Sequence, residues 1–313
     1  MPDISFFIPA YNCSRTIAES VDSIMETNFK TGDELIIVND CSTDNTAEIL
    51  LTIKEKYPVI QIITHKRNKG GAAARNTAVE AANHELLFCL DSDNVLEKSS
   101  IRPLLNFLID QQADIACFNE LRYFSASIAD VEEIWPYKAG VFTITDLLNG
   151  NPSPGTSGNY LFNKTSWLKC NGYTEDLGAL DTFAFGFKQL MEACKMVVMP
   201  GSYYFHRRGY ESYYIRDALK RQKSVSLRLI KLIINYIEFI HPADADYIFS
   251  KKGRYSWYDN LKTKPIRLID KKDSEKIWSE HTIEDTIFNR LANSAGNYKK
   301  GIVRRLKGSK TNK

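Results

Sequence analysis

Residues 86–93 read Leu-Leu-Phe-Cys-Leu-Asp-Ser-Asp, an apolar run followed at once by two carboxylates one residue apart. The run has the length of a buried strand, and residues i and i+2 of a strand share a face. Asp91 and Asp93 can therefore point into one site, where they can hold a hard divalent cation and, through it, the phosphates of a ligand. A helix cap or a solvated turn is the alternative interpretation. The position directly after a buried-type strand favours the ligand site.

The preceding and following segments alternate strand-like and helix-like patterns. The expected strands are 4–8, 35–38, 60–64, 86–90 and 114–118, and the helices between them are 16–25, 46–57, 72–82 and 100–111. Short strands separated by helices of ten or more residues are typical of a parallel sheet with helices on both faces. We therefore predict an α/β fold. Further along, the patterns predict helices near 164–170 and 181–194 and a strand at 196–199.

Polar residues follow four of these strands at the point where each strand ends. They are Pro9-Ala10-Tyr11-Asn12, the run 39–44, the run 65–71 and Asp91-Ser92-Asp93. Ligands of such sheets bind at the carboxyl ends of the strands. The four runs therefore predict one binding crevice.

Two single residues stand out within these runs. Asp40 is placed to accept hydrogen bonds from a base or a ribose, beside Ser42 to Asp44, which cap the next helix. Arg75 follows a Gly-rich turn whose backbone can approach an anion, although an ordinary surface arginine is the simpler interpretation. The patterns GxGxxG and Walker A are absent, so nicotinamide and P-loop functions lose their main support.

Four motifs, in the right order and spacing, resemble those of the family 2 glycosyltransferases, which have the GT-A fold. They are Ile8-Pro9-Ala10-Tyr11-Asn12, the run Ile37 to Thr46, the run Asn68 to Asn76 with Ala-Arg-Asn at its end, and the Asp-x-Asp at 91–93. The resemblance is strong over about residues 3–120 and weaker to about 212. It implies a Rossmann-like, mostly parallel sheet flanked by helices, with a helical C-terminal extension.

The resemblance also implies roles for individual positions. The donor-binding residues are Pro9, Ala10, Tyr11, Asn12, Asp40, Arg75, Asp91, Ser92 and Asp93, and the metal is Mn²⁺ or Mg²⁺, held by Asp93 with Asp91. Pro9, Tyr11 and Asp40 would line the nucleobase pocket. Two positions depart from the family's pattern: Cys41 stands where Gly is usual, and Asn94 stands where Asp is often found. Cys41 demands a turn with a less permissive backbone.

The family's catalytic base is an Asp in a Glu-Asp pair at the start of a helix. The pair falls here on Leu180-Asp181, so the first acid is missing and Asp181 is the predicted base, in preference to Asp176. A helix cap is the alternative role for Asp181. Base activity requires reach to an acceptor hydroxyl and a suitable pKa.

His206 follows the strand expected at 196–199 and is a candidate third metal ligand, with a structural or surface histidine as the alternative. Arg207 and Arg208 are candidates for neutralising a diphosphate.

Composition and charge suggest two parts. Residues 1–214 carry 18 basic and 27 acidic side chains, a net of −9, whereas residues 215–313 carry 23 and 11, a net of +12. We predict a GT-A domain at 1–214, with a nucleotide-sugar half at about 1–120 and an acceptor half at about 121–214, and a basic, mostly helical extension at 215–313. Six scattered cysteines, no signal-peptide pattern and no long apolar run favour the cytoplasm.

The basic part has two interpretations. Its lysines and arginines, with the apolar pattern of residues 224–240, are compatible with peripheral contact at the anionic inner face of a membrane. The alternative is a helical subdomain with a frayed basic end at 299–313. A nucleic-acid partner is not expected, because no recognised motif is present and the body is acidic.

The resemblance thus implies a metal-dependent, inverting glycosyltransferase of the hexosyl- or N-acetylhexosaminyl-transferase class. The expected partners are a nucleotide-sugar donor, most simply a UDP-sugar, and a glycan or lipid-linked acceptor, as in polysaccharide biosynthesis. Two alternatives stay open: an inactive nucleotide-sugar or glycan binding module, and a sugar-phosphate nucleotidyltransferase.

Overall fold

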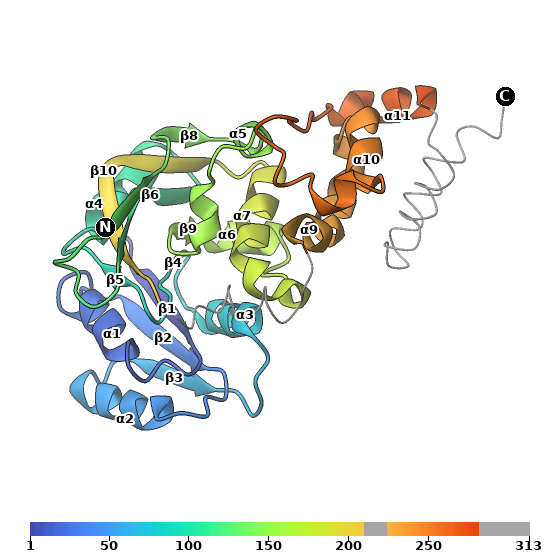
Figure 1. Ribbon diagram of the computed structural model, residues 1–313. Helices are drawn as coiled ribbons and strands as arrows, with labels where there is room; N and C mark the ends of the chain where they lie inside the picture. Colours follow the sequence, from blue (N-terminus) through green and yellow to red (C-terminus); the bar gives the residue numbers. More distant parts are fainter. Residues whose placement is uncertain (210–223, 282–313) are drawn as a thin grey trace. The chain divides into compact units, whose positions relative to one another are not determined.

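The computed structural model describes residues 1–209 and 224–281 of the 313-residue chain (Figure 1). The described residues form two compact units, one of residues 1–143 and 153–209 and one of residues 144–152 and 224–281. The boundary expected at 214/215 lies outside the described residues. Segment 144–152 belongs to the second unit, although it lies within the stretch that the sequence assigns to the acceptor half.

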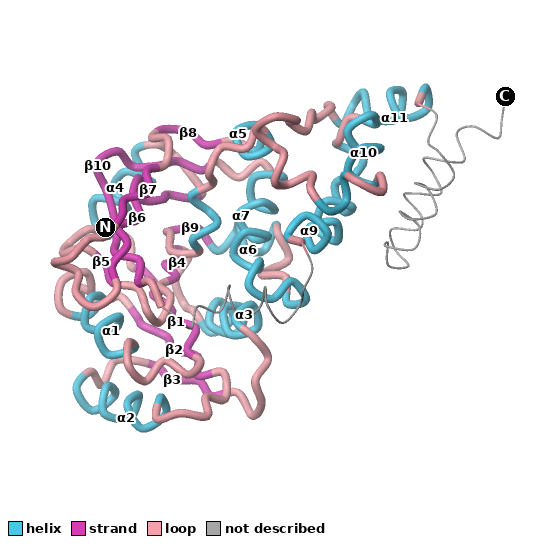
Figure 2. Tube along the Cα trace, in the orientation of Figure 1, coloured by secondary structure: helices cyan, strands magenta, loops and turns pink. Residues whose placement is uncertain are grey.

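The first unit is built on one mixed, mostly parallel sheet whose first half runs in the order β3-β2-β1-β4 (Figure 2). These strands are β1 (Ile4–Ala10), β2 (Glu34–Asn39), β3 (Gln61–Thr64) and β4 (Leu86–Cys89). The helices between them are α1 (Ile17–Met25), α2 (Thr46–Lys56) and α3 (Gly71–Ala81). Helices α1 and α2 lie on one side of the sheet and α3 on the other (Figure 1). The α/β prediction is confirmed.

The second half of the sheet continues in the order β9-β6-β10-β5. Its elements are β5 (Val95–Leu96), α4 (Ile101–Asp110), β6 (Ile115–Phe124), β9 (Leu161–Asn163) and β10 (Met196–Arg207), with β7 (Glu133–Pro136) paired to β6 and β8 (Gly140–Phe142) to β10. The strand expected at 196–199 was predicted too short. Strand β10 shifts register between Met199 and Tyr203 and then continues, so His206 lies inside the strand and not after it.

The remaining helical elements of this unit are η1 (Pro154–Ser157), α6 (Lys164–Lys169), η2 (Glu175–Leu180) and α7 (Asp181–Met191). Helix α7 is buried over nearly its whole length. It packs so closely on η1 that a Cβ on Gly186 would lie 3.1 Å from the Cα of Gly155. Near the start of α7, the Thr182 hydroxyl donates to the Thr156 carbonyl at 2.9 Å, and together these contacts hold the helix, with Asp181 at its start, against η1.

Buried aromatic rings in contact with one another form a large part of the core of this unit. The ring centroids of Phe6 and Phe88 are 6.0 Å apart, those of Phe88 and Phe118 6.2 Å, and those of Phe118 and Tyr204 5.6 Å. All four side chains are almost fully buried.

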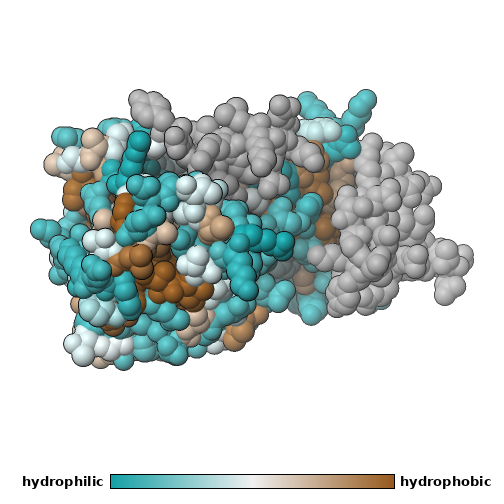
Figure 3. Space-filling model, turned by 90° about the horizontal axis from the view of Figure 1, so that it is seen from below, coloured by the Kyte–Doolittle hydropathy of each residue, from teal (hydrophilic) through white to brown (hydrophobic). Residues whose placement is uncertain are grey.

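At the surface seen from below, hydrophilic side chains surround a hydrophobic patch (Figure 3).

The second unit is helical. Its elements are α5 (Ile144–Leu148), α9 (Val225–Ile233), η3 (Ile234–Phe239), α10 (Pro242–Phe249), η4 (Gly253–Tyr255) and α11 (Lys271–Glu280). The apolar run 224–240 is no continuous helix, because the backbone kinks at Tyr236 (φ −119°). Its apolar side chains are mostly buried, as are Trp257 and Trp278. The basic end 299–313 lies outside the described residues, among which no helix has the length and apolarity needed to cross a membrane.

Candidate functional site

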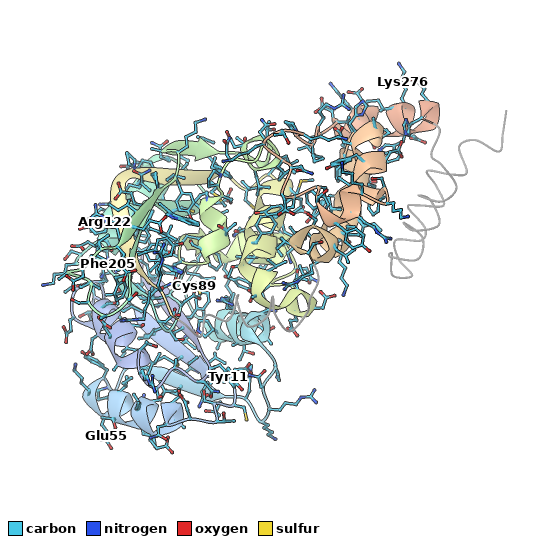
Figure 4. The ribbon with its side chains drawn as sticks, viewed as in Figure 1. Tyr11, Glu55, Cys89, Arg122, Phe205 and Lys276 are labelled. Atoms are coloured by element: carbon cyan, nitrogen blue, oxygen red, sulfur yellow. The ribbon has the colours of Figure 1, made fainter. Side chains whose placement is uncertain are left out.

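The two carboxylates that follow β4 stand in different surroundings. Cys89, the last residue of β4, marks their place in Figure 4. The backbone N–H of Asp91 donates to Asn159 Oδ1 at 2.7 Å, and Asn159 Nδ2 donates back to Asp91 Oδ2 at 3.1 Å. The Asp93 carboxylate has no hydrogen-bond or ion-pair partner among the described residues, and its side chain is exposed. The Asp91 side chain is therefore fixed by hydrogen bonds, whereas the Asp93 carboxylate is available to bind a ligand.

Arg75 joins Asp91 to Asp181. From the first turns of α3, its Nη2 donates to Asp91 Oδ1 at 2.6 Å and its Nη1 to Asp181 Oδ2 at 2.7 Å. Only 9% of the Arg75 side chain is exposed. Burial alone would lower the pKa of Arg75, but Asp181 and Asp91 outweigh it and raise that pKa well above its usual value. Arg75, Asp91 and Asp181 are called the reaction-side cluster below.

Asp181 is the most enclosed member of this cluster. It is the first residue of α7, and its Oδ1 accepts a hydrogen bond from the Thr182 backbone N–H at 2.8 Å. Burial raises the pKa of Asp181 and the Arg75 charge opposes that rise. Asp176, the rival candidate base, lies on η2 with an exposed side chain. The structure thus brings Asp181, and not Asp176, to Arg75 and Asp91.

Asp93, in the turn between β4 and β5, and His206, in β10, lie near each other. Strand β10 pairs with β5, and beyond the last pair the Arg207 N–H donates to Asn94 Oδ1 at 3.1 Å, which brings His206 beside the Asp93 loop. Although Asp93 keeps an exposed surface, the protein atoms packed around it partly desolvate its carboxylate and, with the Asp91 charge, raise the pKa of Asp93 to about 7. Burial lowers the pKa of His206, which favours its neutral imidazole.

These residues are compatible with a divalent cation. The Nδ1 of His206 is buried without a hydrogen-bond partner within the described residues, and the Asp93 carboxylate is unpaired there. No group of three or more His, Cys, Asp or Glu side chains in residues 1–209 and 224–281 forms a complete cage. A cation here would take its other ligands from phosphate and water, as Mg²⁺ commonly does. Asp91, a predicted co-ligand, already has both carboxylate oxygens engaged.

The Asp40 carboxylate is buried and hydrogen-bonded by neighbouring residues of the protein. It is 2% exposed, and its carboxylate accepts hydrogen bonds from the backbone N–H groups of Lys69 (2.9 Å) and Gly70 (2.7 Å). His65 Nδ1 lies 2.6 Å from the same carboxylate, and His65 Nε2 lies 3.0 Å from Thr77 Oγ1. We call Asp40, His65 and residues 66–70 the Asp40 loop. Asp40 therefore shapes the loop that follows β3, while the base contact predicted for it remains a prediction.

The segment after β1 is tied to the segment after β2. The Asn12 N–H donates to Ser42 Oγ at 3.1 Å, and Asn12 Oδ1 accepts from the Thr43 N–H at 2.8 Å. Pro9 and Ala10 end strand β1, whereas Tyr11 is 40% exposed and free to contact a ligand (Figure 4). Asn12 thus links two loops, a role that the sequence motif alone does not reveal.

Other predicted residues are also engaged. The Ser92 carbonyl accepts a hydrogen bond from Thr16 Oγ1 at 2.8 Å, which anchors the Asp91–Asp93 turn to the start of α1. Arg207 is ion-paired with Glu19 and donates to the Asp93 carbonyl at 3.1 Å, and Arg208 is ion-paired with Glu133. Neither arginine is free for a diphosphate in this arrangement.

Asn159 is the residue that sequence reasoning missed. It is 1% exposed and holds both the backbone and the carboxylate of Asp91. The only available signal was its position directly after the turn-rich run 149–158. A contact across 68 residues leaves no local pattern.

Comparison with known proteins identifies the family. The profile described as "Glycosyl transferase family 2" matches residues 5–169, more than half of the chain. The chain belongs to this family of glycosyltransferases. The resemblance inferred from the four motifs is therefore confirmed.

Curated relatives match over parts of their length. A poly(ribitol-phosphate) beta-glucosyltransferase of Bacillus spizizenii is 36% identical over 114 residues, which are 36% of this chain and 18% of that protein. Glycosyltransferase GlyG of Streptococcus pneumoniae is 26% identical over 166 residues, 53% of this chain and 54% of GlyG. TuaG of Bacillus subtilis, a putative teichuronic acid biosynthesis glycosyltransferase, is 34% identical over 110 residues, 35% and 43% of the two chains. The matches thus span at most about half of these relatives.

Solved structures confirm the GT-A-type fold. S. aureus TarS 1–349 in complex with UDP-GlcNAc superposes with a TM-score of 0.62 at 16% identity, over 98% of this chain and 88% of that one. The complex of the same TarS fragment with UDP gives a TM-score of 0.61, over 98% and 87%. At this identity the likeness establishes the architecture of the sheet and its helices.

Proposed function

We propose that this protein transfers a sugar from a UDP-sugar to a hydroxyl group of a saccharide acceptor, with inversion at the anomeric carbon. The observation that carries the proposal is the reaction-side cluster, in which Arg75 bridges the motif carboxylate Asp91 and the candidate base Asp181. Family membership supports it, and so do the UDP and UDP-GlcNAc complexes of the structurally similar TarS.

In the proposed reaction, Asp181 takes the proton of the acceptor hydroxyl while the hydroxyl oxygen attacks the anomeric carbon. The bond from that carbon to the diphosphate breaks, and UDP leaves with the bonding electron pair. The raised pKa of Asp181 makes it a stronger base than an ordinary aspartate. When bound at Asp93, Mn²⁺ or Mg²⁺ stabilises the negative charge that gathers on the leaving diphosphate.

Arg75 connects donor binding to the base. Its guanidinium is shared between two carboxylates, and the Asp181 side chain is only 4% exposed. A donor diphosphate offers Arg75 a competing anion that it can bind bidentately. When Arg75 moves away from Asp181, one oxygen of the Asp181 carboxylate loses its cation partner and becomes more basic. Asp181 therefore becomes an active base when the donor is bound.

Donor binding can be measured first, by thermal shift with UDP-, GDP-, CMP- and dTDP-sugars, each with and without Mn²⁺. A ligand at a hundredfold excess over its dissociation constant raises stability by about 2.7 kcal/mol. We expect a shift with a UDP-sugar that grows with Mn²⁺. A folded protein that no donor stabilises would contradict the proposal.

Two substitutions then separate binding from chemistry. Asp93→Asn should weaken donor binding in Mn²⁺, whereas Asp181→Asn should keep donor binding and lower turnover by about 10²–10⁴-fold, the usual contribution of a general base. Asp176→Asn is the matched control at an exposed position of η2 and should leave turnover unchanged. Loss of turnover in Asp176→Asn with full activity in Asp181→Asn would transfer the base to Asp176.

A further inference from the structure

A row of aromatic rings crosses three neighbouring strands on one face of the sheet. In the registers of β10, β6 and β7, His206 is opposite Tyr123 and Tyr204 is opposite Leu121, which is opposite Trp135. Register partners in adjacent strands point to the same face. The ring centroids are 6.2 Å apart for Tyr204 and His206, 5.0 Å for His206 and Tyr123, and 5.2 Å for Tyr123 and Trp135. These four rings form a continuous row, here called the aromatic strip.

The strip runs from the candidate site to the surface. At its inner end, Asn159 Nδ2, which also binds Asp91, lies 3.4 Å from the Tyr204 hydroxyl. Tyr204 is 1% exposed, whereas Trp135 at the outer end is 49% exposed. Trp135 thus exposes about half of a large aromatic side chain, at the outer end of a row of rings that begins at the candidate site. Such a surface is suited to packing against a ligand.

The outer end of the strip is edged by charged groups. Trp135 Nε1 donates a hydrogen bond to Glu133 Oε1, and Glu133 is ion-paired with Arg208. The Arg208 guanidinium lies 4.7 Å from the centroid of the Tyr123 ring. Tyr123, Trp135, Glu133 and Arg208 are called the outer platform below.

The other face of the same strands differs. Arg122 and Phe205, which are labelled in Figure 4, are register partners one residue along from the strip positions, so alternation places them on the opposite face. There Phe205 packs with Phe124 in a buried cluster, and the Arg122 guanidinium covers the Tyr203 ring at 3.3 Å from its centroid. A cation thus lies over a ring on each face, Arg122 over Tyr203 and Arg208 over Tyr123, whereas Trp135 remains 49% exposed.

We propose that the outer platform binds a sugar ring of the acceptor glycan. This inference rests on the proposed transferase function. A pyranose presents one face of C–H groups, which packs on an aromatic ring, and a rim of hydroxyl groups. A carboxylate and a guanidinium beside the ring can accept from and donate to those hydroxyls. Trp, Tyr and Arg are also the residues that contribute most per contact to binding.

The test uses the full chain and an immobilised array of short oligosaccharides of glucose, N-acetylglucosamine, galactose and mannose. The variants are Trp135→Ala, Trp135→Phe and the matched control Ile134→Ala, which removes a 49%-exposed side chain from the opposite face of the same strand. We expect the unmodified protein to bind one class of oligosaccharide. Trp135→Ala should weaken this binding about tenfold, equivalent to about 1.4 kcal/mol, while Trp135→Phe and Ile134→Ala change it less than threefold.

UDP binding is measured on the same samples, and it should be unchanged in all variants. Saccharide binding that survives Trp135→Ala, or no binding of any saccharide by a protein that binds UDP, would overturn the inference. A dimer in solution that Trp135→Ala dissociates, with saccharide binding unchanged, would instead assign the platform to contact between copies. Absence of UDP binding together with Trp135-dependent saccharide binding would refute the proposed function and leave the platform standing.

Discussion

The reaction-side cluster and the Asp40 loop each bury carboxylates, but they satisfy them in different ways. Asp40 is surrounded by partners from the next loop of the chain, two backbone N–H groups and His65. Asp181 relies for its side-chain partner on Arg75, which is 106 residues away in sequence. The first arrangement joins the ends of the paired strands β2 and β3, 25 to 30 residues apart in sequence, whereas the second exists only once the two halves of the sheet have come together. The cluster should therefore be the more fragile of the two.

Arg75→Met is expected to have the largest effect. It leaves Asp91 and Asp181 close together without their shared cation, and breaking a buried ion pair in this way costs about 3–5 kcal/mol. Denaturant unfolding measures the loss, with Arg67→Met, at an exposed position on the preceding loop, as the control. A loss below about 1 kcal/mol would show that the cluster is solvated and not buried.

The pH dependence of this loss has a definite sign. Without Arg75 the pKa of Asp181 rises further, because the opposing charge is gone. A carboxyl whose folded pKa lies above its unfolded value of about 3.9 destabilises the folded state once the unfolded chain ionises. The deficit of Arg75→Met should therefore be smallest below about pH 4 and should grow as the pH rises. Adding Asp181→Asn should recover part of it at neutral pH.

The contrast between the two regions also explains which features the sequence could predict. Parallel strands bring their carboxyl ends to one edge, so the runs after β1, β2, β3 and β4 were expected to meet, and the fold confirms the sheet that joins them. Asn159 and the contact of Arg75 with Asp181 depend on long-range packing, for which no local pattern exists. His206 was placed after its strand because Pro200-Gly201 reads as a strand end. The structure has an irregularity there, and β10 continues to Arg207.

His65→Leu is expected to have a smaller effect than Arg75→Met. It removes one partner of Asp40 and leaves the two backbone N–H groups of Lys69 and Gly70 in place. Loss of one hydrogen bond to a buried charged group costs about 1–3 kcal/mol. His84→Leu is the control, since the His84 ring makes no hydrogen bond within the described residues, and it should stay within about 0.5 kcal/mol.

The ligand readout of His65→Leu distinguishes a positioning role from a merely structural one. If the Asp40 loop orders the nucleobase side of the site, UDP affinity should fall in His65→Leu, and His65→Gln, which keeps a donor, should restore part of it. Equal UDP affinity in all three proteins would limit His65 to stability.

The smallest expected effect lies at Cys41, directly after Asp40. Its φ of 58° is left-handed, so the turn keeps the conformation that Gly favours even though Cys occupies the position. This corrects the expectation of a less permissive turn. A left-handed backbone lowers the stability of the folded state by about 1–2 kcal/mol for a residue other than Gly. Gly avoids this strain but lowers stability by about 0.5–1 kcal/mol relative to Ala, because it has more conformational entropy in the unfolded chain. Cys41→Gly should therefore be more stable than Cys41→Ala by about 0.5–1 kcal/mol.

The same pair of variants sharpens the comparison between the two regions. The cost at Cys41 comes from its left-handed backbone in the turn directly after Asp40, whereas the cost at the reaction-side cluster comes from buried charge. Cys41→Gly should therefore change stability equally at low and neutral pH, in contrast to Arg75→Met. If Cys41→Gly proved less stable than Cys41→Ala, the turn would not be left-handed. The hydrogen bonds that hold Asp40 to Lys69 and Gly70 would then have to be supported by another part of the loop.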